Sequence, residues 1–428
     1  MILTMQNTIE KNKLNEEQEN IRELMETSSK HLFITGKAGT GKSFLLQEFK
    51  ASTQKEVVFV APTGIAALNI GGQTIHSLFK IKPSDLIEPG QQRTTKATKD
   101  ILEKIETLVI DEVSMVRADL MDAMDEILRF VKNSDEAFGG VQLIVFGDLF
   151  QLPPVVKGKD MENYFLENYG GSYFFNAKVW EYADLETHEL NTNIRQKEDH
   201  EFMELLNALR KGALTAEQFT VLNNRARAQM PSADYVTLAL TNAAVTNINE
   251  KKLRELAEDE FCYEAQVEGK LNPSEYPTEK KLKLKLGAQV MFLRNDKDKR
   301  YVNGSIGKVT YLSKKDIEVE VDGETISVKK EVWEKLRYYK NETSGKLETE
   351  VISAFKQFPL KLSWAITVHK SQGQTLDNVV LDMSYGAFAH GQTYVALSRC
   401  RSLASLYLKK PIRAKDLITD TKVLEFLA

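Results

Sequence analysis

The sequence predicts an α/β fold built from two parallel-sheet units, with a small antiparallel β insertion within the second. Short apolar runs alternate with helical patterns through the first 190 residues, and the same alternation returns after position 362. Residues 251–350 instead combine Lys-rich alternation with short β-branched runs. Apolar strands separated by helices are typical of doubly wound parallel sheets, whereas alternating strands with tight turns are typical of antiparallel ones. The 428 residues suffice for roughly two to four domains.

The first unit is expected to contain buried strands at 31–35, 57–60, 108–110 and 143–146, where nearly all residues are apolar. A helix is expected over 115–131, because apolar residues recur there at the spacing of one helix face. Residues 81–100 contain two prolines, several Lys, Thr and Gln residues and little periodicity. That segment is therefore expected to be a small surface insertion.

The second unit is expected to begin near Leu190, with a strand at 235–240 and helix–strand alternation from Leu362 to the end. Its insertion at 251–350 includes alternating Lys and Leu at 281–286 and turns at Asn303-Gly304 and Asp322-Gly323. These features predict a small antiparallel barrel or sheet.

Composition excludes several classes of protein. The net charge of −4, from 57 basic and 61 acidic residues, argues against a nucleic-acid coat protein. It leaves room for a local basic channel, because screening is strong beyond about 10 Å. We find no apolar run near the ~18 residues of a membrane helix and no targeting segment at the N-terminus. Cys262 and Cys400 lie far apart, so a reducing cytoplasm is the expected compartment.

The glycine-rich segment 36–43 fits G-x-x-x-x-G-K-[ST], the phosphate-binding loop of nucleoside triphosphatases. The apolar run 31–35 precedes it, and the run 44–49 reads as the start of a helix, whose N-terminus favours an anion. Lys42 would pair with the β- and γ-phosphates, and the Ser43 hydroxyl would bind Mg²⁺. The residues expected to bind nucleotide are Gly36, Ala38, Gly39, Thr40, Gly41, Lys42 and Ser43.

Two acidic residues, Asp111 and Glu112, follow the apolar strand at 108–110. In this class of enzyme the first carboxylate holds Mg²⁺, here together with Ser43, and the second polarises the attacking water. An isolated Asp-Glu pair is often only a solvated strand end. The strand follows the phosphate loop by about 70 residues, within one domain's length of chain, which favours the catalytic reading.

Three more residues are candidates for the reaction. Gln151 follows the strand at 143–146 and could hydrogen-bond both the γ-phosphate and water, although an ordinary strand exit would look the same. Arg195 and Arg399 lie in the second unit, where a cation from the far side of a cleft would stabilise charge on the leaving phosphate. Surface arginines are common, so neither is distinguished by composition.

Gln18 has two readings. Asn15 as N-cap with Gln18 three residues later resembles a capping box, which satisfies free N–H groups at a helix start. Gln18 could also read the edge of adenine. Both readings hold together only if its amide faces a base in the complex.

Taken in order, the motifs resemble those of a superfamily-one helicase, and specifically of the Pif (petite integration frequency) DNA helicases. Each short motif is common, whereas the ordered set is specific and spans nearly the whole chain. The matching segments are 14–18, 36–43, 61–67, 74–78, 109–115, 146–154, 193–196, 241–242, 364–377 and 394–399.

The resemblance implies two RecA-like domains with ATP and Mg²⁺ between them, the first at 1–189 and the second at 190–250 and 351–428. It implies that Gln18 reads adenine, that Arg195 and Arg399 are arginine fingers, and that Gln372 and Gly373 help to close the cleft. It places a strand-separating wedge at 81–100 and a barrel of the Src-homology type at 251–350.

The resemblance also implies movement along single-stranded DNA from 5′ to 3′, with unwinding of duplex, forked and G-quadruplex DNA. Threonine and serine hydroxyls, backbone N–H groups and a lysine suit phosphate contacts, and histidines can stack on bases. The residues expected to contact nucleic acid are Pro62, Thr63, Gly64, His76, Ser77, Thr241, Asn242, Thr367, His369 and Lys370. Phe79, Trp364 and Tyr394 are expected in the core.

Other expectations accompany the resemblance. Family members usually carry a smaller residue where Cys400 stands, so a packing change without loss of activity is expected. The chain lacks the long extensions of eukaryotic relatives, which favours a compact bacterial or phage form acting as a monomer, with no membrane partner. Three alternatives stay open: an RNA helicase, a nucleic-acid-stimulated ATPase or translocase without processive unwinding, and a nucleotide-gated binding module.

Overall fold

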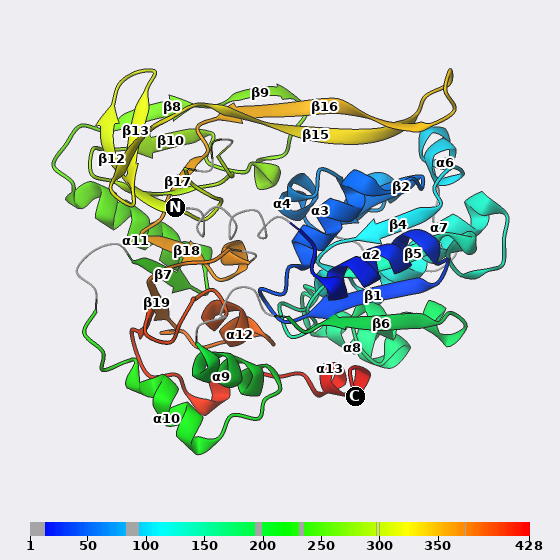
Figure 1. Cartoon of the computed structure of the whole chain (residues 1–428), viewed down its shortest axis with the longest axis horizontal. Coiled ribbons are helices and arrows are strands. Elements are labelled where there is room, and N and C mark those ends of the chain that lie inside the picture. The colour runs from blue at the N-terminus through cyan, green and yellow to red at the C-terminus, as the bar shows by residue number, and fades with distance from the viewer. Residues whose placement is uncertain are drawn as a thin grey trace. The chain divides into compact units, whose positions relative to one another are not determined.

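The computed structural model describes residues 13–82, 94–192, 199–230, 235–296, 298, 300–372 and 374–428. They fold into two compact units. The first takes in the chain to Asp148, residues 154–194 and Tyr338–Glu350, and the second takes in Leu149–Pro153, Arg195–Arg337 and Val351–Ala428. Figure 1 shows the elements of both.

A parallel sheet organises the described part of the first unit, with its six strands in the order β3-β2-β4-β5-β1-β6. Neighbouring strands pair in parallel throughout, for example Leu32 with Ile144 and Val109 with Ile144. The strands are β1 (His31–Gly36), β2 (Val57–Ala61), β3 (Gln73–Thr74), β4 (Thr107–Ile110), β5 (Gln142–Phe146) and β6 (Leu185–Leu190). The four strands predicted in this unit are therefore confirmed, each within about a residue or two of its predicted ends.

Both faces of this sheet are buried, which explains why its strands read as continuous apolar runs. Leu32 and Ile34 pack into one core cluster with residues of the first two helices, whereas Phe33 between them packs edge-on against Phe174, 5.5 Å away. The helices of this unit are α2 (Glu16–Thr27), α3 (Lys42–Ser52), α4 (Gly64–Asn69), α5 (Ile75–Phe79), α6 (Lys96–Leu102), α7 (Ala118–Lys132) and α8 (Lys159–Tyr169), with 3₁₀ turns η2 (Val113–Met115), η3 (Ala137–Gly140), η4 (Phe174–Asn176) and η5 (Lys178–Glu181).

Helix α7 begins three residues later than predicted. Residues 113–115 form the separate turn η2. Arg117 is extended and stands as N-cap, so Met115 lies outside the helix. Two buried carboxylates of α7 then hold neighbouring turns: Asp122 accepts from Val179 N at 3.0 Å, and Asp125 accepts from Phe138 N at 2.6 Å.

The described part of the second unit contains a parallel sheet in the order β18-β7-β19-β20. Its strands are β7 (Val236–Ala239), β18 (Ala365–Thr367), β19 (Val379–Asp382) and β20 (Leu406–Leu408). The accompanying helices are α9 (His200–Arg210), α10 (Ala216–Asn224), α11 (Asn242–Glu255), α12 (Gln392–Leu397) and α13 (Thr421–Phe426), with η7 (His369–Ser371) and η8 (Ala414–Asp416). Parallel sheets in both units confirm the predicted fold class.

The insertion is antiparallel, as predicted, and its described strands form three sheets: β10-β8, β14-β13-β12-β11-β17 and β15-β16-β9. Its strands continue past position 350 to Leu362, because Phe358, Leu360 and Leu362 belong to the same apolar core. The elements are β8 (Phe261–Glu264), β9 (Gln266–Gly269), η6 (Pro273–Glu275), β10 (Lys281–Leu284), β11 (Gln289–Phe292), β12 (Ile306–Leu312), β13 (Ile317–Val321), β14 (Glu324–Val328), β15 (Glu331–Lys340), β16 (Leu347–Gln357) and β17 (Leu360–Leu362).

The ends of β15 and β16 belong to the first unit, within Tyr338–Glu350. The buried Tyr338 hydroxyl accepts a hydrogen bond from the backbone N–H of Phe59 at 3.2 Å, and burial raises the pKa of this tyrosine. Glu56, also in the first unit, accepts from Leu347 N at 3.4 Å.

The surface insertion expected at 81–100 falls mostly outside the described residues, which resume at 94 and include helix α6. Phe79 and Tyr394 are buried, as expected, and Trp364 is partly buried against the insertion's core. Among the described residues, every helix is too short or too polar to cross a membrane.

Candidate nucleotide and nucleic-acid site

The phosphate loop joins β1 to α3 through glycines that the backbone requires. Gly36 has φ of +148°, and a Cβ there would lie 2.7 Å from Leu190 O on β6. Gly39 and Gly41 have φ of 87° and 83°, which favours glycine. The loop therefore turns with its N–H groups at the start of α3, the arrangement that binds phosphate.

The ammonium group of Lys42 folds back onto its own loop. Its Nζ lies 2.6 Å from Gly36 O and 3.1 Å from Lys37 O. Both carbonyls are weak acceptors compared with a phosphate oxygen, so a phosphate of a bound nucleotide could take their place.

Asp111 and Glu112 follow β4, which is separated from β1 by β5 alone. At about 4.8 Å per strand, the end of β4 lies about 10 Å from the start of the phosphate loop. Burial raises the pKa of the Asp111 carboxyl to about 6, partly offset by the N–H of Glu112 and by Lys42. Glu112 N donates to Asp111 Oδ1 at 2.9 Å.

The backbone of Glu112 is left-handed, with φ of 53°. Such a conformation costs a non-glycine residue of the order of 1 kcal/mol and often occurs at functional sites. It turns the chain from β4 directly into η2, of which Glu112 is the N-cap.

The residues present suit a magnesium ion bound with a nucleotide. Ser43 is exposed in the first turn of α3, and Asp111 is half-buried. The described residues contain no group of three His, Cys, Asp or Glu side chains that could hold a metal alone. Magnesium bound to a nucleotide needs only one or two protein ligands, because phosphates and water complete its shell.

Two hydroxyls near the carboxyl ends of β1 and β4 are buried without a hydrogen-bond partner among the described residues. They are Thr35 Oγ1, at the end of β1, and Ser114 Oγ, in η2. Buried polar groups are normally paired, so these two mark a place where water or ligand oxygen would complete the bonding.

Gln18 is almost fully buried and engaged locally. Its Oε1 accepts from Asn15 N at 3.1 Å and its N–H donates to the Asn15 side chain at 2.8 Å, which confirms the capping box. Its Nε2 donates to Thr40 O at 3.2 Å. This last bond attaches the start of α2 to the phosphate loop, a link that the sequence did not indicate.

Gln151 belongs to the second unit, together with the rest of Leu149–Pro153. It is 7% exposed, and its Oε1 accepts from Gln372 Nε2 at 2.9 Å. Gln372 directly follows η7. The two glutamines predicted to act near the nucleotide therefore pair with one another. Gly373 lies outside the described residues.

Arg399 is 1% exposed, and the structure places its guanidinium within the second unit. It donates to Val395 O at 2.9 Å and to Ser371 O at 3.3 Å. It also donates to Gln374 O at 3.4 Å and to Ser398 Oγ at 2.9 Å. In this conformation the guanidinium ties α12 to the loop after η7. Arg195, the other expected finger, lies outside the described residues.

In the first unit, the residues predicted to contact nucleic acid follow β2 and β3, which are parallel neighbours at one edge of the sheet. Thr63 caps α4 by accepting from Ala66 N, next to Pro62 and Gly64. Thr74 caps α5 in the same way, ahead of His76 and Ser77. Burial, and then Arg117, lower the pKa of His76, which favours its neutral ring.

In the second unit, the corresponding residues follow β7 and β18, which are also parallel neighbours. Thr241 caps α11, which begins at Asn242. The buried Thr367 hydroxyl accepts from Lys370 N at 3.2 Å. His369 and Lys370 are exposed. Each unit thus brings its predicted nucleic-acid residues together at the carboxyl ends of adjacent strands.

The chain matches known helicases over most of its length. It matches the PIF1-like helicase family over residues 13–220 and the 2B domain of DNA helicase Pif1 over residues 271–312. It is 34% identical over 412 residues to an ATP-dependent DNA helicase Pif1 from Bdellovibrio bacteriovorus, covering 93% of this chain and 88% of that protein. It is 34% identical to the human ATP-dependent DNA helicase PIF1, covering 93% of this chain and 61% of that protein.

Solved structures agree. The crystal structure of Bacteroides sp Pif1 with ADP-AlF4 aligns with a TM-score of 0.89 and 38% identity, covering 97% of this chain and 96% of that one. The crystal structure of Bacteroides Pif1 bound to ssDNA aligns with a TM-score of 0.68 and 39% identity over the same shares of the two chains.

Proposed function

Because the chain belongs to the Pif1 family of ATP-dependent DNA helicases, we propose that it moves along single-stranded DNA from 5′ to 3′ and unwinds duplex, forked and G-quadruplex DNA. One observation supports this most directly. In the first unit, the nucleotide residues follow β1 and β4, and the nucleic-acid residues follow β2 and β3, the two strands at one side of the same sheet. The same rigid sheet therefore carries both sets, so nucleotide-driven movement of this sheet would move the DNA contacts with it.

On the nucleotide side, Lys42 would leave the Gly36 and Lys37 carbonyls and pair with the β- and γ-phosphates. Ser43 and Asp111 would hold Mg²⁺, which neutralises charge on the phosphates when bound. Glu112 would orient the attacking water and accept its proton, and Gln151 would respond to the γ-phosphate. Arg195 and Arg399 would stabilise the charge that develops on the leaving phosphate.

On the DNA side, the residues favour phosphate contacts that break and form readily. Helix starts after Thr63, Thr74 and Thr241 present backbone N–H groups, and their hydroxyls are already used as caps. Lys370 adds one exposed cation, and the rings of His76 and His369 can stack on any base. Such contacts carry little sequence preference, as translocation requires.

The test is strand displacement on matched substrates with either a 5′ or a 3′ single-stranded tail, with ATP and Mg²⁺. We expect displacement with the 5′ tail and little with the 3′ tail. The reverse result would overturn the proposed direction. A substrate with a G-quadruplex ahead of the duplex tests the third substrate class, and an RNA loading strand tests the alternative of an RNA helicase.

The assembly that acts is also open to measurement. One solved structure that is 38% identical to this chain is described as showing the basis of DNA unwinding at forked DNA by two coordinating Pif1 helicases. We propose that a single copy of this chain suffices for translocation. Single-turnover unwinding amplitudes should then rise linearly with enzyme concentration below saturation, whereas a sigmoidal rise would indicate a dimer.

A further inference from the structure

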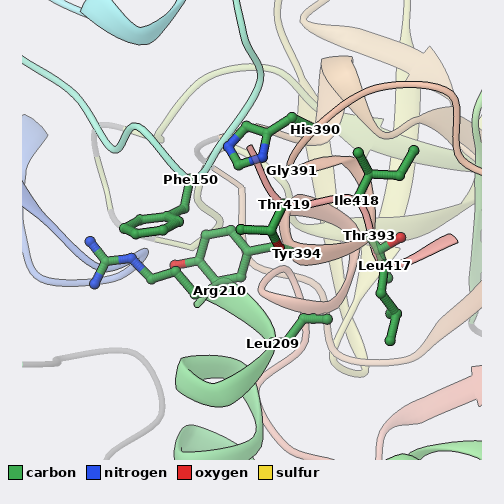
Figure 2. Close-up of a pocket in the computed structure, with 10 residues that line it drawn as sticks. All are labelled: Phe150, Leu209, Arg210, His390, Gly391, Thr393, Tyr394, Leu417, Ile418 and Thr419. Atoms are coloured by element: carbon green, nitrogen blue, oxygen red, sulfur yellow. The ribbon is translucent and has the colours of Figure 1, made fainter. Parts of the chain in front are cut away.

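The segment Leu149–Pro153 continues the chain from β5, yet it is held by the second unit. Leu149 and Phe150 are 0% and 4% exposed. Phe150 lines a small pocket together with residues of α9, α12 and the stretch 417–419 (Figure 2). No local pattern predicts this pocket, because its other lining residues lie about 60 to 270 residues further along the chain.

Two adjacent residues hold the backbone of this segment. His390 Nε2 lies 2.9 Å from Leu149 O. Gly391, with φ of +73°, packs so closely that a Cβ would lie 2.4 Å from the carbonyl oxygens of both Phe150 and Gln151. Both residues therefore contact the main chain of the segment, so these contacts do not depend on the side chains that the segment carries.

The hydrogen bonds of His390 define its tautomer. Its Nδ1 accepts from Asp420 N at 2.9 Å, so Nδ1 bears no proton. The proton of the neutral ring is then on Nε2, which donates it to Leu149 O. His390 is thus a bridge between the start of α13 and the segment at 149–153, with each ring nitrogen in a different role.

A side-chain contact fixes the next residue. The guanidinium of Arg210, at the end of α9, lies 4.4 Å from the centre of the Phe150 ring, in cation–π geometry. Arg210 is itself 4% exposed, so this contact is largely desolvated. Phe150 therefore anchors the segment immediately before Gln151.

The contacts of Leu149 and Phe150 also determine where Gln151 and its partner Gln372 lie. Gln372 donates to Gln151 at 2.9 Å. Gln372 directly follows η7, which contains His369 and Lys370. Displacing the backbone at 149–151 would withdraw the Gln151 amide from a loop that carries residues expected to contact DNA.

We propose that His390 is a positioning residue that seats the 149–153 segment, so that the Gln151–Gln372 pair couples the DNA-contacting loop to the nucleotide. This rests on the proposed function, because it concerns how strongly single-stranded DNA stimulates ATP hydrolysis. His390 acts through the backbone of Leu149.

A matched pair of variants separates the two bonds of His390. In His390→Gln the amide N–H can reach the place of Nε2 and keep the donor to Leu149 O. In His390→Asn the amide oxygen can replace Nδ1 and keep the acceptor for Asp420 N, but the donor to Leu149 is lost. Each variant removes one hydrogen bond, so a purely structural role predicts similar effects for both.

We expect His390→Asn to lower the DNA-stimulated kcat by about five- to tenfold, the worth of one neutral hydrogen bond. Its KM for ATP and its basal hydrolysis should stay near those of the wild type. His390→Gln should retain stimulation within about twofold by the same reasoning. Equal losses in both variants, or no loss in His390→Asn, would overturn the proposal.

Two further measurements keep the proposal testable if one variant folds poorly. Hydrogen exchange at the amides of Phe150, Gln151 and Leu152 should accelerate in His390→Asn and not in His390→Gln, and unchanged exchange in both would count against the seat. Combined with Gln372→Ala, His390→Asn should add no further loss of stimulation. Additive losses would show that His390 acts by another route.

The two hypotheses can fail separately. A wild-type protein without DNA-stimulated hydrolysis would refute the proposed function, and the exchange measurement would still test whether His390 positions the 149–153 segment. A stimulated wild-type protein whose His390→Asn variant is equally stimulated would refute only the positioning role of His390.

Discussion

Lys42 in the first unit and Arg399 in the second are both expected to meet the phosphates, yet they are held very differently. Lys42 is half-buried and bonds to two carbonyls of its own loop, Gly36 and Lys37. Arg399 is 1% exposed and donates to three backbone carbonyls and a hydroxyl. A motif can therefore hold its cation in a conformation that is ready to bind a phosphate, as at Lys42. It can also hold it in a conformation in which the cation already donates to other groups, as at Arg399.

The difference separates two costs of assembling the site. If Lys42 pairs with phosphates as expected, it would exchange carbonyl oxygens for stronger acceptors, at little structural cost. If Arg399 is to meet a phosphate, it would have to give up buried hydrogen bonds, which would leave carbonyls of α12 and of the loop after η7 to find other partners. Its expected role would therefore require a local rearrangement of the second unit around Arg399.

The largest effect is expected from Lys42→Ala. Removing the charge expected to pair with the β- and γ-phosphates should lower kcat by about 10³ or more, with the apparent Tm nearly unchanged because the Gly36 and Lys37 carbonyls stay able to bind water. Steady-state ATPase with saturating single-stranded DNA measures this. DNA binding should persist, and Lys37→Ala in the same loop is the matched control. Substantial turnover in Lys42→Ala would contradict the assigned role.

Arg399→Lys should reduce kcat by about 10²–10³, because an ammonium cannot reproduce the guanidinium fork. Unlike Lys42→Ala, it should also lower the apparent Tm by on the order of 5 °C, since several buried bonds are lost. Thermal denaturation and ATPase assays on the same preparation test both. The control is Arg401→Lys: Arg401 is exposed and pairs with Asp377 at 2.9 Å. A loss of kcat with no change in Tm would show that the internal bonds of Arg399 contribute little.

Cys400 offers a probe of the rearrangement around Arg399. It is fully buried, and burial raises the pKa of its thiol from 9.0 to about 12, so little reactive thiolate exists at pH 8. Exposure would return the pKa toward its usual value and increase reactivity. In a Cys262→Ser protein, which removes the exposed thiol, labelling of Cys400 should accelerate about tenfold with a non-hydrolysable ATP analogue and single-stranded DNA. The same protein without ligands is the control. An unchanged labelling rate would mean that Arg399 keeps its present hydrogen bonds.

The smallest effect is expected from Gln18→Leu, which tests the phosphate loop that contains Lys42. It removes the bond that Gln18 Oε1 accepts from Asn15 N and the bond to Thr40 O, so the KM for ATP should rise about threefold to fivefold while kcat changes little. Asn15→Ala removes the other half of the capping box, the bond from Gln18 N to Asn15 Oδ1, keeps the bond to Thr40 O, and should leave the KM near that of the wild type. If both variants raise the KM equally, the capping box matters and the link to the phosphate loop does not.

Local patterns predicted much of this molecule. The strands at 31–35 and 143–146 and the phosphate loop between β1 and α3 could be read from the sequence because their signals are contiguous: apolar runs, glycines at left-handed positions and a lysine at the helix start. The capping box at Asn15 and Gln18 is equally local. The start of α7 was misplaced because apolar periodicity continues through η2 and does not show where the helix begins.

The rest depends on contacts between distant positions. No pattern near Leu149 predicts that His390, 241 residues later, hydrogen-bonds to its carbonyl oxygen. Nothing in the motif at 394–399 shows that Arg399 is turned onto Ser371. The antiparallel insertion was expected to end at 350, yet Phe358 and Leu360 complete its core, since strand partners are chosen by packing rather than by the boundaries of a pattern.

The bond between Phe59 and Tyr338 joins residues 279 positions apart. At roughly 5–20 residues per second of synthesis, the hydroxyl leaves the ribosome roughly 15–60 s after the amide it will bind. The chain also passes between its units at 148/149, 153/154, 194/195, 337/338 and 350/351. The first sheet can therefore assemble early in translation, but this contact on β2 must wait until most of the second unit has been made.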